Sequence, residues 1–257
     1  MLEERAPSTR ALEETEAAFL ESMPAVYREA FTSEQVREHA AIAARRGECT
    51  SHLELWRVFS DGLYVFCVVA DDRPGLLANI CRVLVAHELE VLSAQIHCRA
   101  RRGKAAEAFD LFWVRPQAQR KGGTTLEPSA VEALAADVES ALYVAARSTL
   151  PPPGTRPRFI GASTPPRVFF NASALRRGSY VLIVEALDCP GLLLSISLAL
   201  HRERVHILAS DVRTEGGLAR DCFEVASPSG APFSSERLAA IRQAVVDAVR
   251  ERLAEIA

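Results

Sequence analysis

The sequence lacks the features by which membrane and secreted proteins are recognised. Its longest apolar run, residues 63–70, is far shorter than the roughly 20 residues that a membrane-spanning helix needs. Residues 1–5 read Met-Leu-Glu-Glu-Arg, without the basic-then-apolar layout of a signal peptide. The formal net charge of −3 is close to neutral, which disfavours nucleic acid and anionic membranes as main partners. We therefore expect a cytoplasmic protein.

Sequence motifs of common catalytic sites are also missing. The chain has no Gly-rich dinucleotide fingerprint, Walker loop, His-Glu-x-x-His pair or Gly-x-Ser-x-Gly turn. Its six cysteines include no Cys-x-x-Cys pair, which favours free thiols in a reducing compartment. Cys49 and His52 have metal-ligand spacing but lack a partner pair. We predict no metal and no cofactor, and we expect His39 and His52 to be surface residues.

The sequence contains a repeated six-residue motif. Residues 72–77 read Asp-Arg-Pro-Gly-Leu-Leu, and residues 188–193 read Asp-Cys-Pro-Gly-Leu-Leu. An apolar strand-like segment precedes each copy, at 64–68 and at 180–184. Apolar residues at helical spacing follow each copy. The repetition indicates two copies of one supersecondary unit.

The remaining elements follow the same order in both units. Strand side chains alternate between faces, so Leu92, Ala94, Ile96 and Cys98 are predicted to share one face of their strand. The same rule groups Leu208, Ser210 and Val212. The predicted strands are 53–59, 63–70, 90–99 and 108–114 in the first unit and 168–171, 180–186, 205–213 and 220–226 in the second; the predicted helices are 75–87 and 128–147, then 191–204 and 235–256.

Two further segments complete the chain. A helical preface precedes the first unit, and Thr32 with Gln35 forms a capping-box pattern at the start of its last helix. Asp61-Gly62 signals a hairpin between the first two strands. Residues 149–166 are rich in proline and are predicted to be a stiff linker.

The repeated unit resembles the ACT domain, a small ferredoxin-like regulatory module that binds amino acids. Both copies continue into a strand that reads Asp-x-Phe-x-Val, at 110–114 and at 221–225. The tandem, with its Pro-rich linker and the strand at 167–171, is similar to the C-terminal region of bacterial PII uridylyltransferases. Residues 23–27 (Met-Pro-x-x-Tyr) and the helix that contains His39 resemble the segment that enters the first unit there.

The resemblance implies an α+β fold with two ferredoxin-like βαββαβ-type ACT domains in tandem after a short N-terminal helical segment. The implied division is a helical segment at 1–50, ACT domain 1 at 51–148, a linker at 149–166 and ACT domain 2 at 167–257. It further implies that the units pair, within the chain or in a homodimer.

The catalytic motifs of that family do not match this chain. Its transferase domain carries Gly-Ser followed by an Asp-x-Asp pair, because two carboxylates hold the magnesium ions. Here Gly178-Ser179 is followed later by Asp188, but Pro190 stands where the second carboxylate belongs. The hydrolase domain of the family needs a His-Asp pair, and the chain has no His-Asp dipeptide. We therefore expect no catalysis by this chain alone.

The repeated loop suits a zwitterionic ligand. The first N–H groups of a helix have no intrahelical partner and, with the helix dipole, favour a carboxylate. A glycine lets a ligand approach the backbone, and an aspartate can meet an α-ammonium group. An alternative is that each aspartate caps the helix and no ligand binds. The candidate ligand-binding residues are Asp72, Pro74, Gly75, Leu76, Leu77, Asp188, Pro190, Gly191, Leu192 and Leu193.

A second tier of candidates lies on the strand that would face the neighbouring unit's loop. These residues are Gln95, His97, Asp211 and Arg213; a solvated sheet face or a polar pairing interface is the alternative for each. The leading hypothesis is a non-catalytic amino-acid sensor, with glutamine as the ligand implied by the resemblance and a nitrogen-signalling protein as a possible partner. The alternatives are a pairing module without ligand and the regulatory fragment of a uridylyltransferase.

Overall fold

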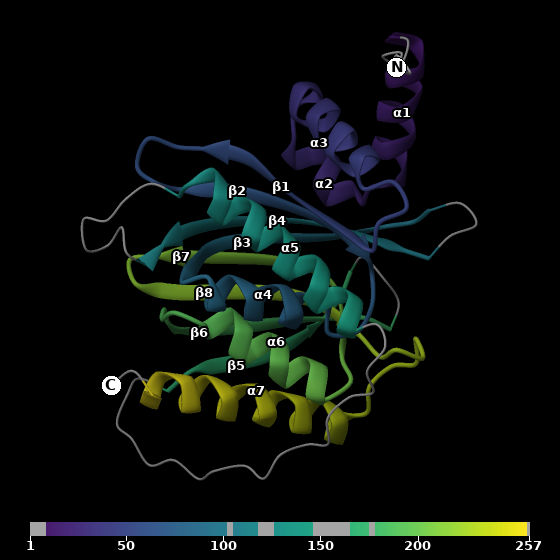
Figure 1. Cartoon of the computed structure of the whole chain (residues 1–257). Coiled ribbons are helices and arrows are strands. Elements are labelled where there is room, and N and C mark those ends of the chain that lie inside the picture. The colour runs from purple at the N-terminus through teal and green to yellow at the C-terminus, as the bar shows by residue number, and fades with distance from the viewer. Residues whose placement is uncertain (1–8, 102–104, 118–125, 146–164, 175–177, 256–257) are drawn as a thin grey trace.

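The computed structural model describes residues 9–101, 105–117, 126–145, 165–174 and 178–255. Within them, one eight-stranded antiparallel sheet has the order β1-β2-β4-β3-β7-β8-β6-β5 (Figure 1). This arrangement confirms the predicted α+β class. The strands are β1 Ser51–Val58, β2 Tyr64–Asp71, β3 Leu89–Arg99, β4 Glu107–Pro116, β5 Arg167–Ala172, β6 Tyr180–Leu187, β7 His206–Glu215 and β8 Leu218–Ala226. The helices are α1 Thr9–Ser22, α2 Ala25–Ala30, α3 Ser33–Arg45, α4 Leu76–Ala86, α5 Pro128–Ala145, α6 Leu192–Arg202 and α7 Ser235–Glu255.

The two halves of the sheet repeat the same element order. The first half runs β1-β2-α4-β3-β4-α5 and the second runs β5-β6-α6-β7-β8-α7. They join where β3 pairs with β7, with Gln95 opposite Asp211. These two residues hold equivalent positions in the repeat, so an approximate two-fold axis passes between them. The domain boundaries at 51–148 and 167–257 stay a prediction, and most of the 149–166 linker lies outside the described residues.

The faces of the sheet are covered differently in the two halves. Helices α4 to α7 cover one face of the whole sheet, whereas α1 to α3 cover the other face over the first half (Figure 1). This explains why every residue from Tyr64 to Ala70 in β2 is buried. The equivalent strand β6 has residues of intermediate burial at Val181 and Glu185, and Leu187 is exposed. A strand covered on both sides is apolar throughout, and one covered on one side alternates.

A β-bulge in each half interrupts the predicted alternation of side chains between the two faces of the sheet. The β3–β4 register shifts between Val91 and Ser93, and the β7–β8 register shifts between Ile207 and Ala209. A bulge inserts one extra residue, so the side chains before it change faces. Val91 and Ile207 therefore pack against the helix-side core, and the prediction that Leu92 and Leu208 would continue the apolar face was wrong.

The helical preface holds a buried aromatic cluster. Thr32 and Gln35 form the predicted capping box at the start of α3. The expectation of a surface position was wrong for His39, which is fully buried, with Nδ1 2.6 Å from the Tyr27 hydroxyl oxygen. Tyr27, in turn, lies edge-on to His97 of β3. Among the described helices, none is long and apolar enough to cross a membrane.

Candidate functional site

The first repeated loop turns from β2 into α4 through a left-handed glycine. Gly75 is the N-cap residue of α4 with φ of 83°, and no side chain caps this helix. Gly75, and not Asp72, therefore holds the N-cap position of α4. Instead, the Cys98 thiol donates to Asp72 Oδ2 at 2.8 Å, and His206 Nε2 lies 3.2 Å from Asp72 Oδ1. Because His206 begins β7, the first loop reaches across to the second half of the molecule.

A small cavity of about 30 Å³ adjoins the first loop. Residues of both halves line it: Asp72, Gly75 and Asp110 come from the first half, and His201 and His206 come from the second. The imidazole of His201 lies on Gly75 so closely that a Cβ there would stand 2.5 Å from His201 Cε1. The first loop is therefore closed by α6 and β7 of the other half.

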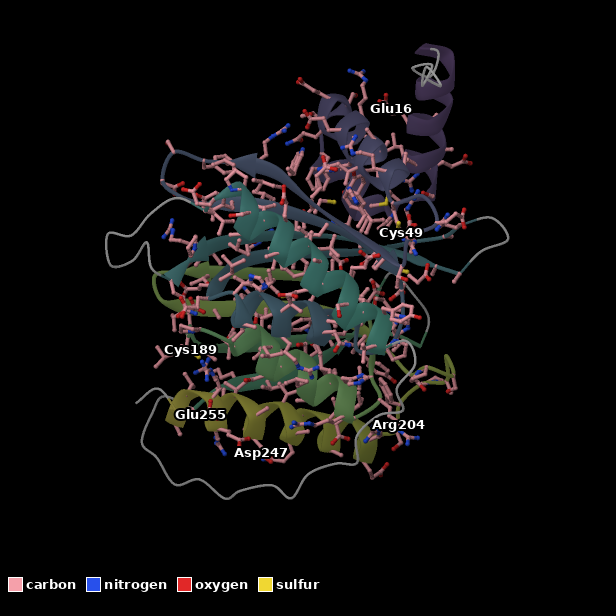
Figure 2. All side chains as sticks on the ribbon, viewed as in Figure 1. Glu16, Cys49, Cys189, Arg204, Asp247 and Glu255 are labelled. Carbon is pink, nitrogen blue, oxygen red and sulfur yellow. The ribbon has the colours of Figure 1, made fainter. Side chains whose placement is uncertain are left out.

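The second loop repeats this geometry with different neighbours. Gly191 is the N-cap residue of α6 with φ of 79°, so Asp188 does not hold the N-cap position either. The adjoining cavity of about 20 Å³ is lined by the loop, by Asp221, and by Glu90 and other residues at the start of β3 in the first half. The loop lies beside the C-terminal end of α7 (Figure 2), where Arg252 Nε donates to the Pro190 carbonyl at 2.7 Å.

The approximate two-fold axis relates the linings of the two cavities. The offset that separates Gly75 from Gly191 in the sequence also separates Cys81 from Ser197, Val85 from His201 and Glu90 from His206. Each member of these pairs lines the cavity of the opposite half's loop. Each loop thus meets equivalent segments of the other half, but the side chains there differ in charge.

A buried aspartate is among the residues that line each cavity. Asp110 and Asp221 are each 1% exposed and line the first and second cavities respectively. Neither oxygen of Asp110, and not Oδ1 of Asp221, has a hydrogen-bond partner among the described residues. Burial, with the nearby charge of Asp72, raises the pKa of Asp110 well above its usual range. Burial, followed by the charges of Asp188 and Asp211, raises the pKa of Asp221 to about 7.

The predicted candidates are only partly brought together. Asp72, Gly75, Leu76 and Leu77 all line the first cavity. In the second loop, Asp188, Gly191, Leu192 and Leu193 line the second cavity. Both leucine pairs are buried in the core that α4 and α6 share with the sheet. Pro190 contributes its carbonyl to Arg252, while Pro74 is not among the residues that line the first cavity.

The second-tier residues lie mostly away from the two loop cavities, and Asp211 and Arg213 instead line an open cavity of about 720 Å³ beside β6, β7 and β8. Gln95 and Asp211 pair on the two-fold axis, and Arg213 forms an ion pair with Asp211 at 2.8 Å on the exposed face of β7. His97 lines the first cavity, but its ring packs against Tyr27 under the helical preface. The antiparallel register explains this placement, because it brings the start of each strand, and not its middle, to the opposite loop.

Sequence reasoning missed the residues that close the cavities. His201, His206 and Glu90 come from the opposite half, and no local pattern signals their approach. A signal did exist for Asp110 and Asp221. Each is the first residue of the repeated Asp-x-Phe-x-Val motif. A charged residue repeated within an otherwise buried strand indicates a role beyond packing.

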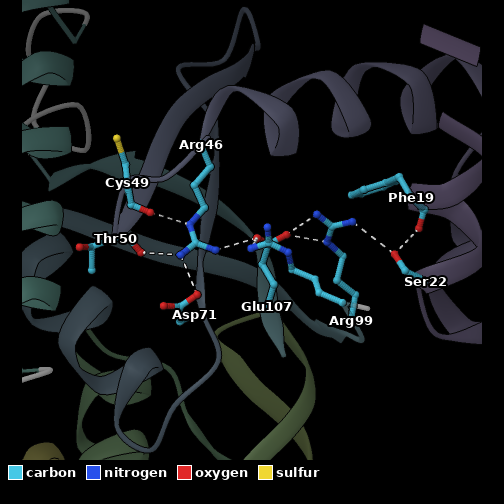
Figure 3. Close-up of polar contacts among 9 residues, drawn as sticks. Phe19, Ser22, Arg46, Cys49, Thr50, Asp71, Arg99 and Glu107 are labelled. Carbon is cyan, nitrogen blue, oxygen red and sulfur yellow. Dashed lines mark hydrogen bonds and ion pairs between the residues drawn. The ribbon is translucent and has the colours of Figure 1, made fainter. Parts of the chain in front are cut away.

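An ion-pair cluster attaches the helical preface beside the first loop (Figure 3). Arg46 follows α3 and donates to Glu107 Oε1 and to Asp71 Oδ1, each at 2.7 Å. Glu107 also accepts from Arg101 at 2.8 Å and from Arg99. Because Asp71 directly precedes Asp72, the position of the first loop is tied to that of the preface.

Comparisons with known proteins point to one group of relatives. A bifunctional uridylyltransferase/uridylyl-removing enzyme of Streptomyces coelicolor is 28% identical over 71% of this chain and 22% of its own length. The enzymes of the same name from Novosphingobium aromaticivorans and Burkholderia orbicola are 30% and 31% identical over 74% and 69% of this chain. The chain resembles a region of the bifunctional uridylyltransferase/uridylyl-removing enzymes. It spans about a fifth of the length of these curated relatives, 22%, 20% and 19% respectively.

Other comparisons add little to this assignment. No family model matches the chain. A solved structure of an unknown protein from Galdieria sulphuraria shares 18% identity, with a TM-score of 0.24, over 78% of this chain and 93% of its own. The resemblance therefore rests on the uridylyltransferase relatives.

Proposed function

We propose that the chain is a non-catalytic regulatory module whose two repeated units are ACT-like and sense an amino acid at their loops. The observation that carries this proposal is the position of both loops, each of which closes on the opposite half of the molecule. A ligand at either loop would act on the contact between the halves. Glutamine is the candidate ligand that the resemblance suggests.

The chemistry of the first loop supports a zwitterionic ligand. The backbone N–H groups at the start of α4, which has no side-chain cap, would receive the ligand's carboxylate. Asp72, whose side chain is 8% exposed, would meet the α-ammonium group. Charge-assisted hydrogen bonds of this kind are stronger than neutral ones.

The size of the cavities determines how binding would act. Ligand pockets usually measure about 300–1,000 Å³, whereas these cavities measure about 30 and 20 Å³. An amino acid would therefore enter only when the opposite half withdraws, which breaks the contact between His206 and Asp72. Such a ligand favours the open arrangement of the halves over the closed one.

Calorimetry with glutamine and other amino acids tests the proposal. We expect heat of binding with the wild-type chain and a loss of affinity of about tenfold or more in Asp72→Asn, because a charge-assisted hydrogen bond contributes roughly 1.5–3 kcal/mol. Asp61→Asn, which alters an exposed hairpin residue bound to Arg115, is the matched control. Absence of heat with any amino acid on folded wild-type protein would refute the proposal.

Regulation of a catalytic partner forms the second part of the proposal. The relatives are named for transfer and removal of uridylyl groups, and the chain spans only about a fifth of their length. We therefore assign it the regulatory task and place the chemistry elsewhere, with a nitrogen-signalling protein of the PII type as the partner, in the cytoplasm. A uridylylation assay with the isolated chain, PII and UTP should show no transfer.

A pairing module without ligand is the second candidate function. The observation that favours it is that β3 and β7 already join the two units into one sheet, and small cavities suit a closed structural joint. It predicts that hydrogen exchange along β3 and β7 stays unchanged when glutamine is added. The sensor proposal predicts faster exchange there.

A further inference from the structure

The two cavities differ in the charge of their lining residues. The inference from this difference concerns a ligand of the second loop, and it rests on the proposed function. In the first cavity, Asp72 and Asp110 are accompanied by Arg73, His201 and His206. In the second, the equivalents of these three residues are Cys189, Val85 and Glu90. Every exchange removes a basic or titratable nitrogen, and one of them adds a carboxylate.

The second cavity is therefore lined by three carboxyl groups. These belong to Glu90, Asp188 and Asp221, and none of the described lining residues is a lysine, arginine or histidine. Arg252 is not among the residues that line this cavity, and it binds the Pro190 carbonyl and Glu255. The charge of Asp188 disfavours ionisation of Asp221, because like charges in a buried space repel one another.

Asp221 is the member of this group that points to a missing ligand. Its side chain is 1% exposed, and Oδ1 has no hydrogen-bond partner among the described residues. Buried polar atoms are normally hydrogen-bonded, so an orphaned carboxylate oxygen in a cavity indicates a donor that is absent from the protein itself. A cationic donor would satisfy the oxygen and relieve the repulsion together.

The volume of the cavity limits the size of this donor. The cavity of about 20 Å³ holds one water-sized particle, for which roughly 10–15 Å³ suffices. Ammonium has about the size of water and carries only donors, as the –NH₃⁺ group of a lysine does.

We propose that the cavity at the second loop binds a compact ammonium group through Asp188, Asp221 and Glu90. The group is either the free ammonium ion or the amino end of an organic ligand. Asp221 accepts one of its N–H bonds, and Asp188 and Glu90, which line the same cavity, supply further negative charge. The first cavity, which is lined by Arg73, His97, His201 and His206, does not share this selectivity.

Thermal unfolding of the full chain measures the effect. Ammonium chloride, methylammonium chloride, potassium chloride and tetramethylammonium chloride are compared at equal ionic strength, because salt screens exposed charges equally. The pH is set above the pKa of about 7 of Asp221. We expect ammonium to raise the Tm by about 2 °C or more relative to tetramethylammonium, with potassium without effect. Methylammonium separates the sources: a rise equal to that of ammonium indicates an amino end, and no rise indicates the free ion.

Matched variants locate the effect. Asp221→Asn removes the ammonium-dependent rise, whereas Asp110→Asn, at the equivalent position of the first cavity, retains it. Glu90→Gln reduces the rise and serves as the second variant if Asp221→Asn does not fold. A rise that persists in both Asp221→Asn and Glu90→Gln, or an equal rise with potassium, overturns the inference.

Glutamine calorimetry separates this inference from the proposed function. Glutamine binding without any ammonium effect on the Tm refutes the ammonium site and leaves the sensor proposal standing. An ammonium effect that depends on Asp221, in a protein that binds no amino acid, supports the ammonium site and refutes amino-acid sensing.

Discussion

His201 and Gly75 belong to opposite halves of the molecule, yet the imidazole of His201 lies directly on the glycine. A Cβ at position 75 would stand 2.5 Å from His201 Cε1 and 2.7 Å from Nδ1. The φ of Gly75, 83°, also disfavours any L residue. The first loop is therefore shaped both by its own backbone and by a side chain from the other half.

Gly75→Ala should destabilise the protein through these two effects. The left-handed backbone costs an L residue roughly 1–2 kcal/mol, and the added methyl group displaces His201. Gly216→Ala isolates the backbone effect, because Gly216 has φ of 57° and a Cβ added there would have nothing within 4 Å. Urea unfolding should show a larger loss for Gly75→Ala, and His201→Ala should remove the excess in the double variant. Equal losses for the two glycine variants would show that His201 moves aside without cost.

Breaking the ion-pair cluster at Glu107 should weaken the attachment of the helical preface. The Glu107 side chain is 2% exposed and that of Arg46 is 5% exposed, so Glu107→Gln removes the buried carboxylate that Arg46 and Arg99 share and leaves Arg46 with Asp71. We expect a loss of about 3–5 kcal/mol in free energy of unfolding. Glu16→Gln is the control, because its partner Arg37 is 67% exposed and such surface pairs contribute about 0–1 kcal/mol. A loss for Glu107→Gln as small as that of the control would contradict a structural role for the cluster.

Two buried histidines should make the preface sensitive to acid. Burial lowers the pKa of His39 to about 3 and the pKa of His97 to about 4, so the folded state holds both rings neutral. Their contribution to stability is present above the unfolded pKa of 6.5 and is lost as the pH falls toward these values. Charges near the rings come from Glu38 and Arg57 for His39 and from Asp211 for His97.

Urea unfolding between pH 7 and roughly 4 measures this loss. His39→Leu should reduce the pH dependence, because only the His97 ring then remains to be protonated. Tyr27→Phe removes the hydroxyl that lies 2.6 Å from His39 but keeps both rings, so the acid-dependent loss should remain. A pH dependence that is unchanged in His39→Leu would exclude this histidine as its source.

Asp221 should give the stability a pH dependence opposite to that of the buried histidines, and Asp221→Asn should remove it. The pKa of Asp221 is raised to about 7 in the folded state, so the protonated form contributes stability that is present below the unfolded pKa of 3.8 and lost as the pH rises through about 7. Without ammonium, the variant should therefore gain stability relative to wild type between these values. An equal pH dependence of wild type and variant, in the same urea series, would show that Asp221 does not titrate there.

Much of the fold followed from local pattern. The repeat at 72–77 and 188–193, the order of strands and helices and the Thr32 capping box were predicted because each depends on residues close in sequence. The bulges beside Leu92 and Leu208 were missed, because a bulge depends on pairing with a distant strand. His39 was misplaced for a related reason: its burial comes from strand β4 and from Trp56, which lies beyond the end of its own helix.

The candidate loops were predicted from sequence, but their surroundings were not. Asp72 and Asp188 were known only as acidic residues before Pro-Gly, and the structure shows that Gly75 and Gly191 hold the N-cap positions of the two helices. Gln95 and Asp211 were expected beside the loops and lie on the two-fold axis. Strand periodicity tells which residues share a face, but it does not tell which residue of another strand stands opposite.

The sequence by itself determined the repeated unit, because spacing of apolar residues and turn residues sets secondary structure locally. Only the tertiary structure decided that the two units share one sheet through β3 and β7, and that each loop closes on the other half. The register between strands more than 100 residues apart, in which Gln95 pairs with Asp211, depends on long-range packing. That register places His206 beside Asp72 and Glu90 beside the second loop, and so makes two similar loops into two chemically different sites.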